Sequence, residues 1–78
     1  MEIYYSKQAE KFLKKQRTIT RNRIRNAIQN LPAGDVKKLQ GINGYRLRVG
    51  NYRIIFSRNG DVLYIERIDN RGQIYKEV

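Results

Sequence analysis

The sequence has neither cysteine nor histidine among its 78 residues. Without cysteine, the chain can form neither a disulfide framework nor a thiolate metal site. Without histidine, it lacks the usual general base and the commonest metal ligand of proteins. We therefore expect no metal site and no cofactor, and an enzyme built from this chain would need another side chain to carry protons.

Long apolar segments are absent as well. The N-terminus lacks the apolar stretch of a signal peptide, and no other segment is long enough to span a bilayer. We therefore expect a cytoplasmic protein. No repeat, linker or low-complexity tract divides the chain, so residues 1–78 are expected to form a single domain. That length is close to the size at which one hydrophobic core is only marginally sufficient.

Acidic residues are scarce. Lys and Arg number 17 against 7 Asp and Glu, which gives a formal net charge of +10 at pH 7. Self-repulsion of this size weakens the compact state, but the same charge attracts polyanions. Composition alone therefore indicates a nucleic acid, an anionic membrane or an acidic protein as the partner.

A β-hairpin is predicted for residues 45–56, where apolar and polar residues alternate on both sides of a Gly50-Asn51 link. A two-residue link of this kind is a strong signal for a tight turn. It pairs Arg48 with Arg53. Alternation then places the apolar and aromatic side chains on one face of the hairpin and three arginines on the other. These arginines are Arg46, Arg48 and Arg53.

The opposed arginines of this hairpin carry an energetic cost. Like charges directly opposite each other destabilise a sheet by roughly a few tenths of a kcal/mol or more. The cost indicates an anionic ligand, because guanidinium groups stay charged and bind phosphate in a bidentate manner. The alternative is a solubilising face, but such a face normally has acids interspersed, and here only Glu66 is expected to reach the cluster.

Two amphipathic helices are predicted before the hairpin. Ser6 is a suitable cap for the first helix, and Thr18 or Thr20 for the second, which ends at Pro32 and Gly34. The short link between them predicts an antiparallel helical hairpin with one shared apolar face. Its apolar residues follow the spacing i, i+3, i+4: Ala9, Phe12 and Leu13, then Ile24, Ala27, Ile28 and Leu31.

A third strand is expected at about residues 62–68, after a second tight turn with Asn59 and Gly60 as its central residues. This turn would bring Glu66 opposite Arg53. The same register has three further pairs: Arg58 with Asp61, Phe56 with Leu63, and Ile54 with Ile65.

Together these elements predict an α+β domain. Its expected order is a short N-terminal strand at residues 3–5, the two helices, a loop through residues 35–41, and a three-stranded antiparallel meander. The helices would cover one face of the sheet. The other face, with the arginines, Tyr64 and Glu66, would be left to water or a ligand.

Basic residues also occur outside the hairpin. Those on the helices are read as a solvated face that adds long-range attraction to RNA or DNA. At the C-terminal end, Arg71 and Tyr75 either belong to a polar turn with the ring packed at the sheet edge, or supply another guanidinium and a phenol to the arginines. Four more basic residues are expected to contact the polyanion, which is RNA under the resemblance described next: Lys37, Lys38, Arg58 and Arg67.

The chain resembles toxins of the RelE/ParE superfamily from type II toxin–antitoxin modules over nearly its whole length. The resemblance is strongest from Lys38 onward, in K-L-Q-G, in Y-R-L-R-V-G-N-Y-R-I-I-F, and in an R-x-x-x-Y that ends at Arg71 and Tyr75. It implies a RelE-like fold and ribosome-dependent cleavage of mRNA in the A site. In that reaction the 2′-hydroxyl attacks the adjacent phosphate without a metal, giving a cyclic phosphate and a free 5′-hydroxyl.

The resemblance also implies roles for residues. Arg53 and Arg71 are expected to hold the scissile phosphate, and Tyr75 to orient the nucleotide or help move a proton. Relatives often have lysines where this chain has arginines, which are poor proton carriers because their pKa exceeds about 12. Glu66 would then act either as the base or, as we favour, by neutralising Arg53. The expected catalytic set is Arg46, Arg48, Arg53, Arg71, Tyr75 and Glu66.

The implied partners are an acidic antitoxin and the ribosome with its A-site mRNA, with neither a membrane nor a small-molecule cofactor. An acidic, partly disordered segment that folds on binding would complement the positive charge of the chain. Two alternatives stay open. One is a ParE-like toxin that poisons DNA gyrase, and the other is a non-catalytic module that binds RNA or DNA.

Overall fold

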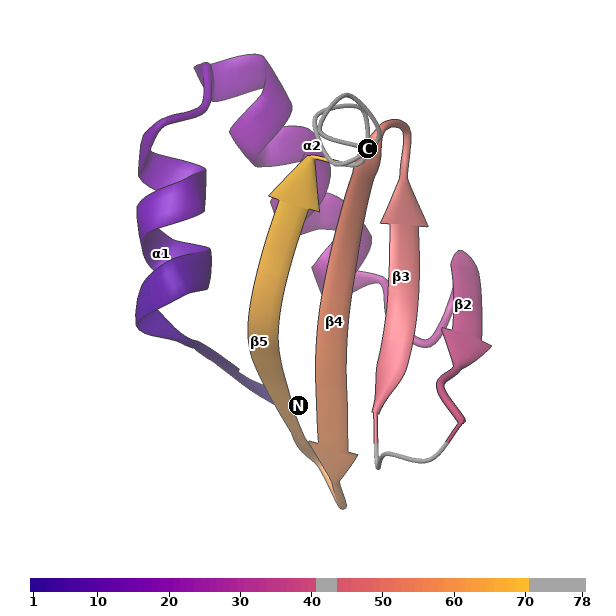
Figure 1. The fold of residues 1–78 in the computed structure, drawn as a ribbon. Coiled ribbons are helices and arrows are strands. Elements are labelled where there is room, and N and C mark those ends of the chain that lie inside the picture. Colours follow the sequence, from indigo (N-terminus) through magenta and orange to yellow (C-terminus); the bar gives the residue numbers. More distant parts are fainter. Residues whose placement is uncertain (41–43, 71–78) are drawn as a thin grey trace.

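Two helices cover one face of a five-stranded sheet (Figure 1). The computed structural model describes residues 1–40 and 44–70, and its strands lie side by side in the order β1-β5-β4-β3-β2. This confirms the α+β class. The elements are β1 (Glu2–Tyr5), α1 (Lys7–Lys14), α2 (Thr18–Gln29), β2 (Asp35–Lys38), β3 (Tyr45–Val49), β4 (Tyr52–Asn59) and β5 (Val62–Asn70).

The predicted antiparallel meander is present as β3, β4 and β5, but the sheet is larger and mixed. β1 pairs with β5 in parallel, with Ile3 opposite Leu63. β2, which was expected to be part of a loop, pairs antiparallel with β3 and places Val36 opposite Leu47. Only one of the four residues of β2 is apolar, so its sequence has no alternating pattern. Its extended conformation comes from the hydrogen bonds that the edge of β3 offers.

The first hairpin, β3 to β4, has the predicted register. Val49 lies opposite Tyr52, and Arg48 opposite Arg53. Gly50 has a φ of 57°, and no other residue type among the described residues has a positive φ. A positive φ at the first central residue alone is the signature of a type II′ turn, whose twist matches that of the strands.

The second hairpin, β4 to β5, has a different register from the predicted one. Its central turn residues are Gly60 and Asp61, with the glycine again first at a φ of 60°, so Asn59 lies opposite Val62. Asn59 was wrongly expected to be a turn residue. The four expected pairs are therefore wrong: Arg58 with Asp61, Phe56 with Leu63, Ile54 with Ile65, and Arg53 with Glu66.

A β-bulge in β5 changes the pairing once more. Glu66 is the extra residue, because Ile65 and Arg67 lie opposite neighbouring residues of β4. Strict alternation beyond Ile65 would point Arg67 into the core. With the bulge, Arg67 lies on the outer face and Ile68 is fully buried.

Both helices lie where the apolar periodicity predicted them. Ser6 caps α1 as expected, since its Oγ accepts a hydrogen bond from the amide of Ala9 at 3.1 Å. The predicted cap of α2 by Thr18 or Thr20 is wrong, because Arg17 occupies the cap position without a capping bond from its side chain. Within the described ranges, no helix is both long and apolar enough to cross a membrane.

Arg21 connects the two helices. Its guanidinium, on α2, donates hydrogen bonds to the carbonyls of Leu13 at 3.0 Å and Gln16 at 2.9 Å, at the end of α1. The carbonyl of Leu13 also accepts a hydrogen bond from the amide of Gln16 at 3.1 Å, so Arg21 adds a second donor there and connects α2 to the chain that follows α1. At least one of the basic helical residues thus has a structural function.

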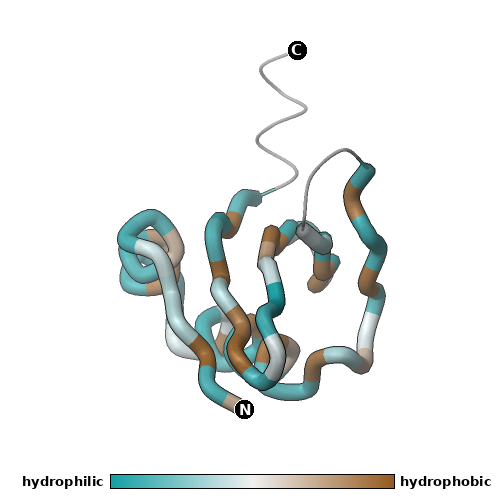
Figure 2. The backbone as a smooth tube through the Cα atoms, turned by 90° about the horizontal axis from the view of Figure 1, so that it is seen from below, coloured by the Kyte–Doolittle hydropathy of each residue, from teal (hydrophilic) through white to brown (hydrophobic). Residues whose placement is uncertain are grey.

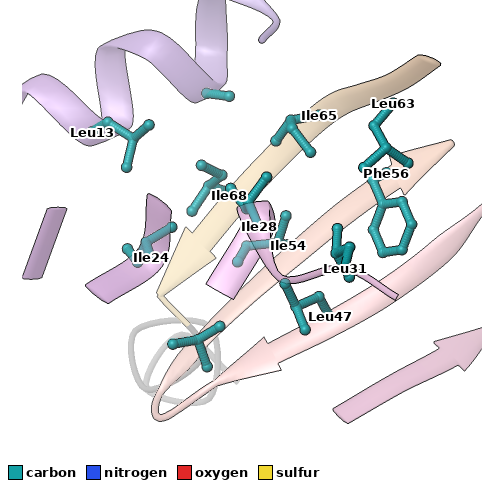
Figure 3. Close-up of a cluster of buried hydrophobic side chains, with 12 residues drawn as sticks. Leu13, Ile24, Ile28, Leu31, Leu47, Ile54, Phe56, Leu63, Ile65 and Ile68 are labelled. Carbon is teal, nitrogen blue, oxygen red and sulfur yellow. The ribbon is translucent and has the colours of Figure 1, made fainter. Parts of the chain in front are cut away.

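The core lies between the helices and the inner face of the sheet (Figure 3). Hydrophilic and hydrophobic residues alternate along much of the sheet (Figure 2), so one set of side chains points inward and the other outward. The predicted apolar stripes of both helices supply its helical side. The buried residues are Ala9, Leu13, Ile24, Ile28 and Leu31 from the helical half, and Leu47, Val49, Ile54, Phe56, Leu63, Ile65 and Ile68 from the strands.

Candidate nucleic-acid interface

The outer face of the sheet, which the described helices leave uncovered, carries charged side chains across four strands. Strand pairing arranges them in two rows, and each row spans roughly 14 Å because neighbouring strands lie about 4.8 Å apart. One row is Lys37, Arg46, Ile55 and Arg67, and the next is Asp35, Arg48, Arg53 and Asp69. We call the charged residues of these rows the arginine face: Lys37, Arg46, Arg48, Arg53, Arg67, Asp35 and Asp69.

Asp69 is the carboxylate that contacts two of these arginines. Its Oδ2 lies 2.9 Å from Nε of Arg67 and 3.7 Å from Nη2 of Arg53, and the Asp69 side chain is only 12% exposed. Glu66 was expected in this role. Asp69 lies three positions beyond Glu66 along β5, which is roughly 10 Å of extended chain. The predicted pairing of Glu66 with Arg53 is therefore wrong, and Asp69 is the acid that faces Arg53.

A second carboxylate reaches the arginine face from β2. Oδ1 of Asp35 lies 3.5 Å from Nη2 of Arg46, whose side chain is 18% exposed. The expectation that a single acid meets the cluster is therefore wrong. Two carboxylates among five cations offset part of the repulsion between the arginines. The arginine face therefore destabilises the sheet less than the three arginines of the hairpin would by themselves.

Arg46 and Arg53 keep hydrogen-bond donors that are not satisfied. The Nε atoms of both side chains are buried and have no hydrogen-bond partner within residues 1–40 and 44–70. A buried donor without a partner costs about 1–3 kcal/mol and is rare in native proteins. A guanidinium that turns toward a phosphate can present Nε together with one Nη in bidentate geometry. Bound phosphate would therefore remove this cost.

The structure brings five of the predicted site residues together on one face. Three come from the expected catalytic set and two from the expected RNA contacts: Arg46, Arg48, Arg53, Lys37 and Arg67.

Two other predicted RNA contacts lie on the opposite side of the sheet. Lys38 lies opposite Tyr45, and Arg58 opposite Leu63, in the rows whose side chains point toward the helices. Nε of Arg58 donates to the carbonyl of Gly60 at 2.9 Å, within its own turn. The predicted Arg71 and Tyr75 lie outside the described residues.

Sequence reasoning missed Asp35 and Asp69 for different reasons. Asp35 was missed because β2 has no recognisable pattern. Asp69 was missed because the turn was displaced by one residue and the bulge was not seen. A signal for the bulge is nonetheless present, since the apolar residues Leu63, Ile65 and Ile68 change their spacing from two to three.

The arginine face can bind an extended polyanion and stabilise negative charge on it. Its guanidinium groups come from three adjacent strands, and such a spread suits an anion with several charged groups in succession better than an anion with one charged group. In the described part of the chain, no group of three or more Asp, Glu, His or Cys side chains is arranged to hold a metal ion.

Comparison with known proteins gives consistent matches. The model of the family described as "ParE toxin of type II toxin-antitoxin system, parDE" matches residues 3–75. The chain is 36% identical to Toxin RelE3 of Methanocaldococcus jannaschii, over 96% of both chains. Among solved structures, it resembles the toxin of the RelB-RelE antitoxin-toxin complex from Methanococcus jannaschii, with a TM-score of 0.74 and 36% identity over 95% of this chain and 96% of that one. It also resembles the archaeal RelE-RelB complex from Pyrococcus horikoshii, with a TM-score of 0.74 and 30% identity over 92% and 96%.

Proposed function

The chain belongs to the RelE/ParE superfamily of toxins from type II toxin–antitoxin systems, and from this premise we propose that it is a ribosome-dependent endoribonuclease that cuts mRNA in the A site. The observation that carries the proposal is the arginine face. Its guanidinium groups come from three adjacent strands, and two of them have buried Nε donors without a partner among the described residues. Such a surface matches the phosphates of an extended RNA strand.

The proposed reaction is a transesterification. The 2′-hydroxyl oxygen of one nucleotide attacks the adjacent phosphorus, and the bond to the 5′-oxygen of the next nucleotide breaks. The 2′-hydroxyl loses its proton and the leaving oxygen gains one, so the products are a cyclic phosphate and a free 5′-hydroxyl. Negative charge grows on the phosphate oxygens in the transition state. A preorganised donor directed at such charge contributes roughly 3 kcal/mol.

Arg53 is the residue that we expect to hold the scissile phosphate. It lies near the middle of its row, and its Nη2 is 3.7 Å from Oδ2 of Asp69, an ion pair that favours the position of the guanidinium on the outer face before RNA binds. Asp69 is thus a positioning residue, which also orients Arg67. Arg71 and Tyr75 remain in the proposed set, the latter to orient the nucleotide or to move a proton.

We further propose an acidic antitoxin and the ribosome as partners. Two relatives of known structure are complexes of RelE with RelB, and this chain carries a formal net charge of +10 that an acidic segment would complement. A neighbouring reading frame that encodes a small acidic protein, and whose co-expression restores growth, is the expected observation.

The proposal is tested by inducing the protein in cells and mapping the 5′ ends of mRNA. Cuts within translated codons are expected. Arg53→Ala should lower cleavage by about 10²–10³-fold, the effect of removing one transition-state donor. Arg58→Ala is the matched control, because it removes the same charge from the same strand but on the opposite face. Growth arrest with unchanged mRNA would contradict the proposal.

A second candidate is favoured by the family model that matches, which is described for ParE toxins. A ParE-like toxin that poisons DNA gyrase would use the same fold without the proposed catalytic residues. Gyrase-dependent DNA breaks that Arg53→Ala leaves unchanged would establish this candidate. Without any toxicity on induction, a non-catalytic module would remain, and its arginine substitutions should lower both RNA affinity and the salt dependence of binding.

A further inference from the structure

Two exposed tyrosines stack on the outer face of the sheet, next to the arginine face. Tyr4 on β1 and Tyr64 on β5 lie opposite each other in the parallel register. Their ring centroids are 5.8 Å apart with an interplanar angle of 21°. Tyr4 is 53% exposed and Tyr64 43%, so these large rings keep much of their surface in water instead of burying it in the core. We call them the tyrosine pair.

The tyrosine pair borders an open hollow of about 560 Å³. The hollow is lined by the two tyrosines, by Tyr5 and Ser6 after Tyr4, by Ile65 and Glu66 after Tyr64, and by Ser57 of β4. It therefore extends from the rings along β5 toward Arg67 and the arginine face. Its volume is within the range of sites for small ligands.

Glu66 is the acidic residue among those that line the hollow. The bulge makes it the extra residue of β5, and its backbone carbonyl is fixed by a hydrogen bond of 2.8 Å from Oγ of Ser6. Its exposed carboxylate makes neither an ion pair nor a hydrogen bond to any of the residues in the described ranges. An ionised carboxylate only accepts hydrogen bonds, so a ligand has to bring the donor.

We infer that the tyrosine pair and Glu66 form a subsite for one unpaired RNA base, which stacks on the rings and donates from its amino group to the carboxylate. The inference rests on the proposed function in that the ligand is RNA, and it adds a selectivity for the base. Aromatic rings beside a positively charged track are the usual elements of single-strand binding. Ser57, opposite Tyr64, is four residues from Arg53 on β4, roughly 13 Å. An RNA strand that leaves the subsite along β4 would thus reach the arginine face.

The chemistry of Glu66 predicts which bases fit. Cytosine has an amino group that can donate a hydrogen bond to a carboxylate. Uracil has a carbonyl oxygen at the same position, which cannot donate. The subsite therefore favours cytosine over uracil. Tyr4 is held in its orientation by a hydrogen bond of 2.6 Å from its hydroxyl to Oε2 of Glu2, and this bond raises the pKa of the phenol above its ordinary value.

Binding of fluorescein-labelled RNA octamers of cytidine and of uridine, measured by anisotropy at several salt concentrations, tests the inference. The wild-type chain should bind the cytidine octamer several-fold more tightly. Tyr64→Ala should weaken binding of both octamers by about tenfold without changing the salt slope, because the ring contacts no phosphate. Tyr64→Phe, which keeps the ring, should restore wild-type affinity. Glu66→Gln should abolish the preference for cytidine.

Several results would overturn the inference. They are the absence of binding to either octamer at low salt, equal affinity of the wild-type chain for both, unchanged affinity in Tyr64→Ala, or a loss that Tyr64→Phe fails to rescue. Failure of the proposed function is distinguishable. If the octamer results are as expected while induced cells show no mRNA cleavage, the subsite stands and the endoribonuclease proposal fails. If induced cells show mRNA cleavage while Tyr64→Ala binds both octamers as tightly as the wild-type chain, the endoribonuclease proposal stands and the subsite fails.

Discussion

The two β-hairpins have similar turns, but only one of them has the register that its sequence predicts. In both, a glycine with a φ near 60° is the first central residue of the turn, namely Gly50 and Gly60. The first hairpin was predicted with Gly50 in that position and is correct throughout. The second was predicted with Gly60 as the second central residue, and every pair that followed was wrong.

The difference between the hairpins shows where the charged groups of the site come from. The first hairpin follows strict alternation, and the charged residues on its outer face are all arginines. The second contains a bulge, and beyond the bulge it contributes Asp69 and Arg67 to that face. The cations of the arginine face thus come mainly from regular strands, whereas its better buried acid depends on an irregularity.

The largest effect on stability is expected for a residue whose burial depends on the bulge. Ile68→Ala should lower the free energy of unfolding by about 2–5 kcal/mol, because Ile68 is fully buried only when Glu66 is an extra residue. Arg67→Ala is the matched control from the neighbouring position. It should cost under about 1 kcal/mol, since the Arg67 side chain is 62% exposed and its ion pair with Asp69 is screened by solvent.

Denaturant unfolding of both variants measures the two effects. If Arg67→Ala were the more destabilising change, Arg67 rather than Ile68 would point toward the core and β5 would have no bulge. Both hairpins would then follow strict alternation.

Most of the fold could be predicted from the sequence because its main elements have strong local signals. The helices have continuous apolar stripes, and residues 45–56 alternate around a glycine turn. β2 could not be predicted, because a four-residue strand with one apolar residue is specified by its neighbour β3 rather than by its own pattern. The parallel pairing of β1 with β5 is also a tertiary property, since residues about sixty positions apart have to meet.

The candidate site was predictable to the extent that it lies on regular structure. Arg46, Arg48 and Arg53 could be placed because strict alternation fixes their face. A shift of one residue in a strand moves its side chains to the other face, so the turn and the bulge decided which acid meets Arg53. The two errors together exchanged Asp69 for Glu66.

The second prediction concerns Asp69, which takes the place beside Arg53 that was expected for Glu66. Asp69→Asn should lower the free energy of unfolding by about 1–2 kcal/mol at low salt, because it leaves Arg53 and Arg67 without the carboxylate that they share. The effect should shrink as salt is added, since both arginines are partly exposed. Glu66→Gln, which removes the same charge from the bulge, should change stability by less than about 0.5 kcal/mol.

The pair of variants is compared by thermal or denaturant unfolding at two salt concentrations. A larger loss in Glu66→Gln than in Asp69→Asn would mean that Glu66, after all, is the acid that neutralises Arg53. RNA affinity offers a second measurement, because loss of the positioning carboxylate should weaken binding less than loss of Arg53 itself.

The smallest effects are expected at the turns, where the hairpins are most alike. Gly60→Ala should lower the free energy of unfolding by roughly 1 kcal/mol, because alanine is strained at a positive φ. No steric cost is added, since a Cβ there would have no atom within 4 Å. Gly50→Ala should cost slightly more. Its Cβ would lie 3.0 Å from Nη2 of Arg23, which has to move but is the flexible end of a long side chain.

Chemical denaturation of the two glycine variants can resolve this difference, which is on the order of a few tenths of a kcal/mol. A Gly50→Ala/Arg23→Ala double variant isolates the steric part, because the extra cost at Gly50 should vanish once the guanidinium is removed. If Gly60→Ala were neutral while Gly50→Ala was costly, the second turn would not hold its glycine at a positive φ. The register of β5, and with it the contact between Asp69 and Arg53, would then need another explanation.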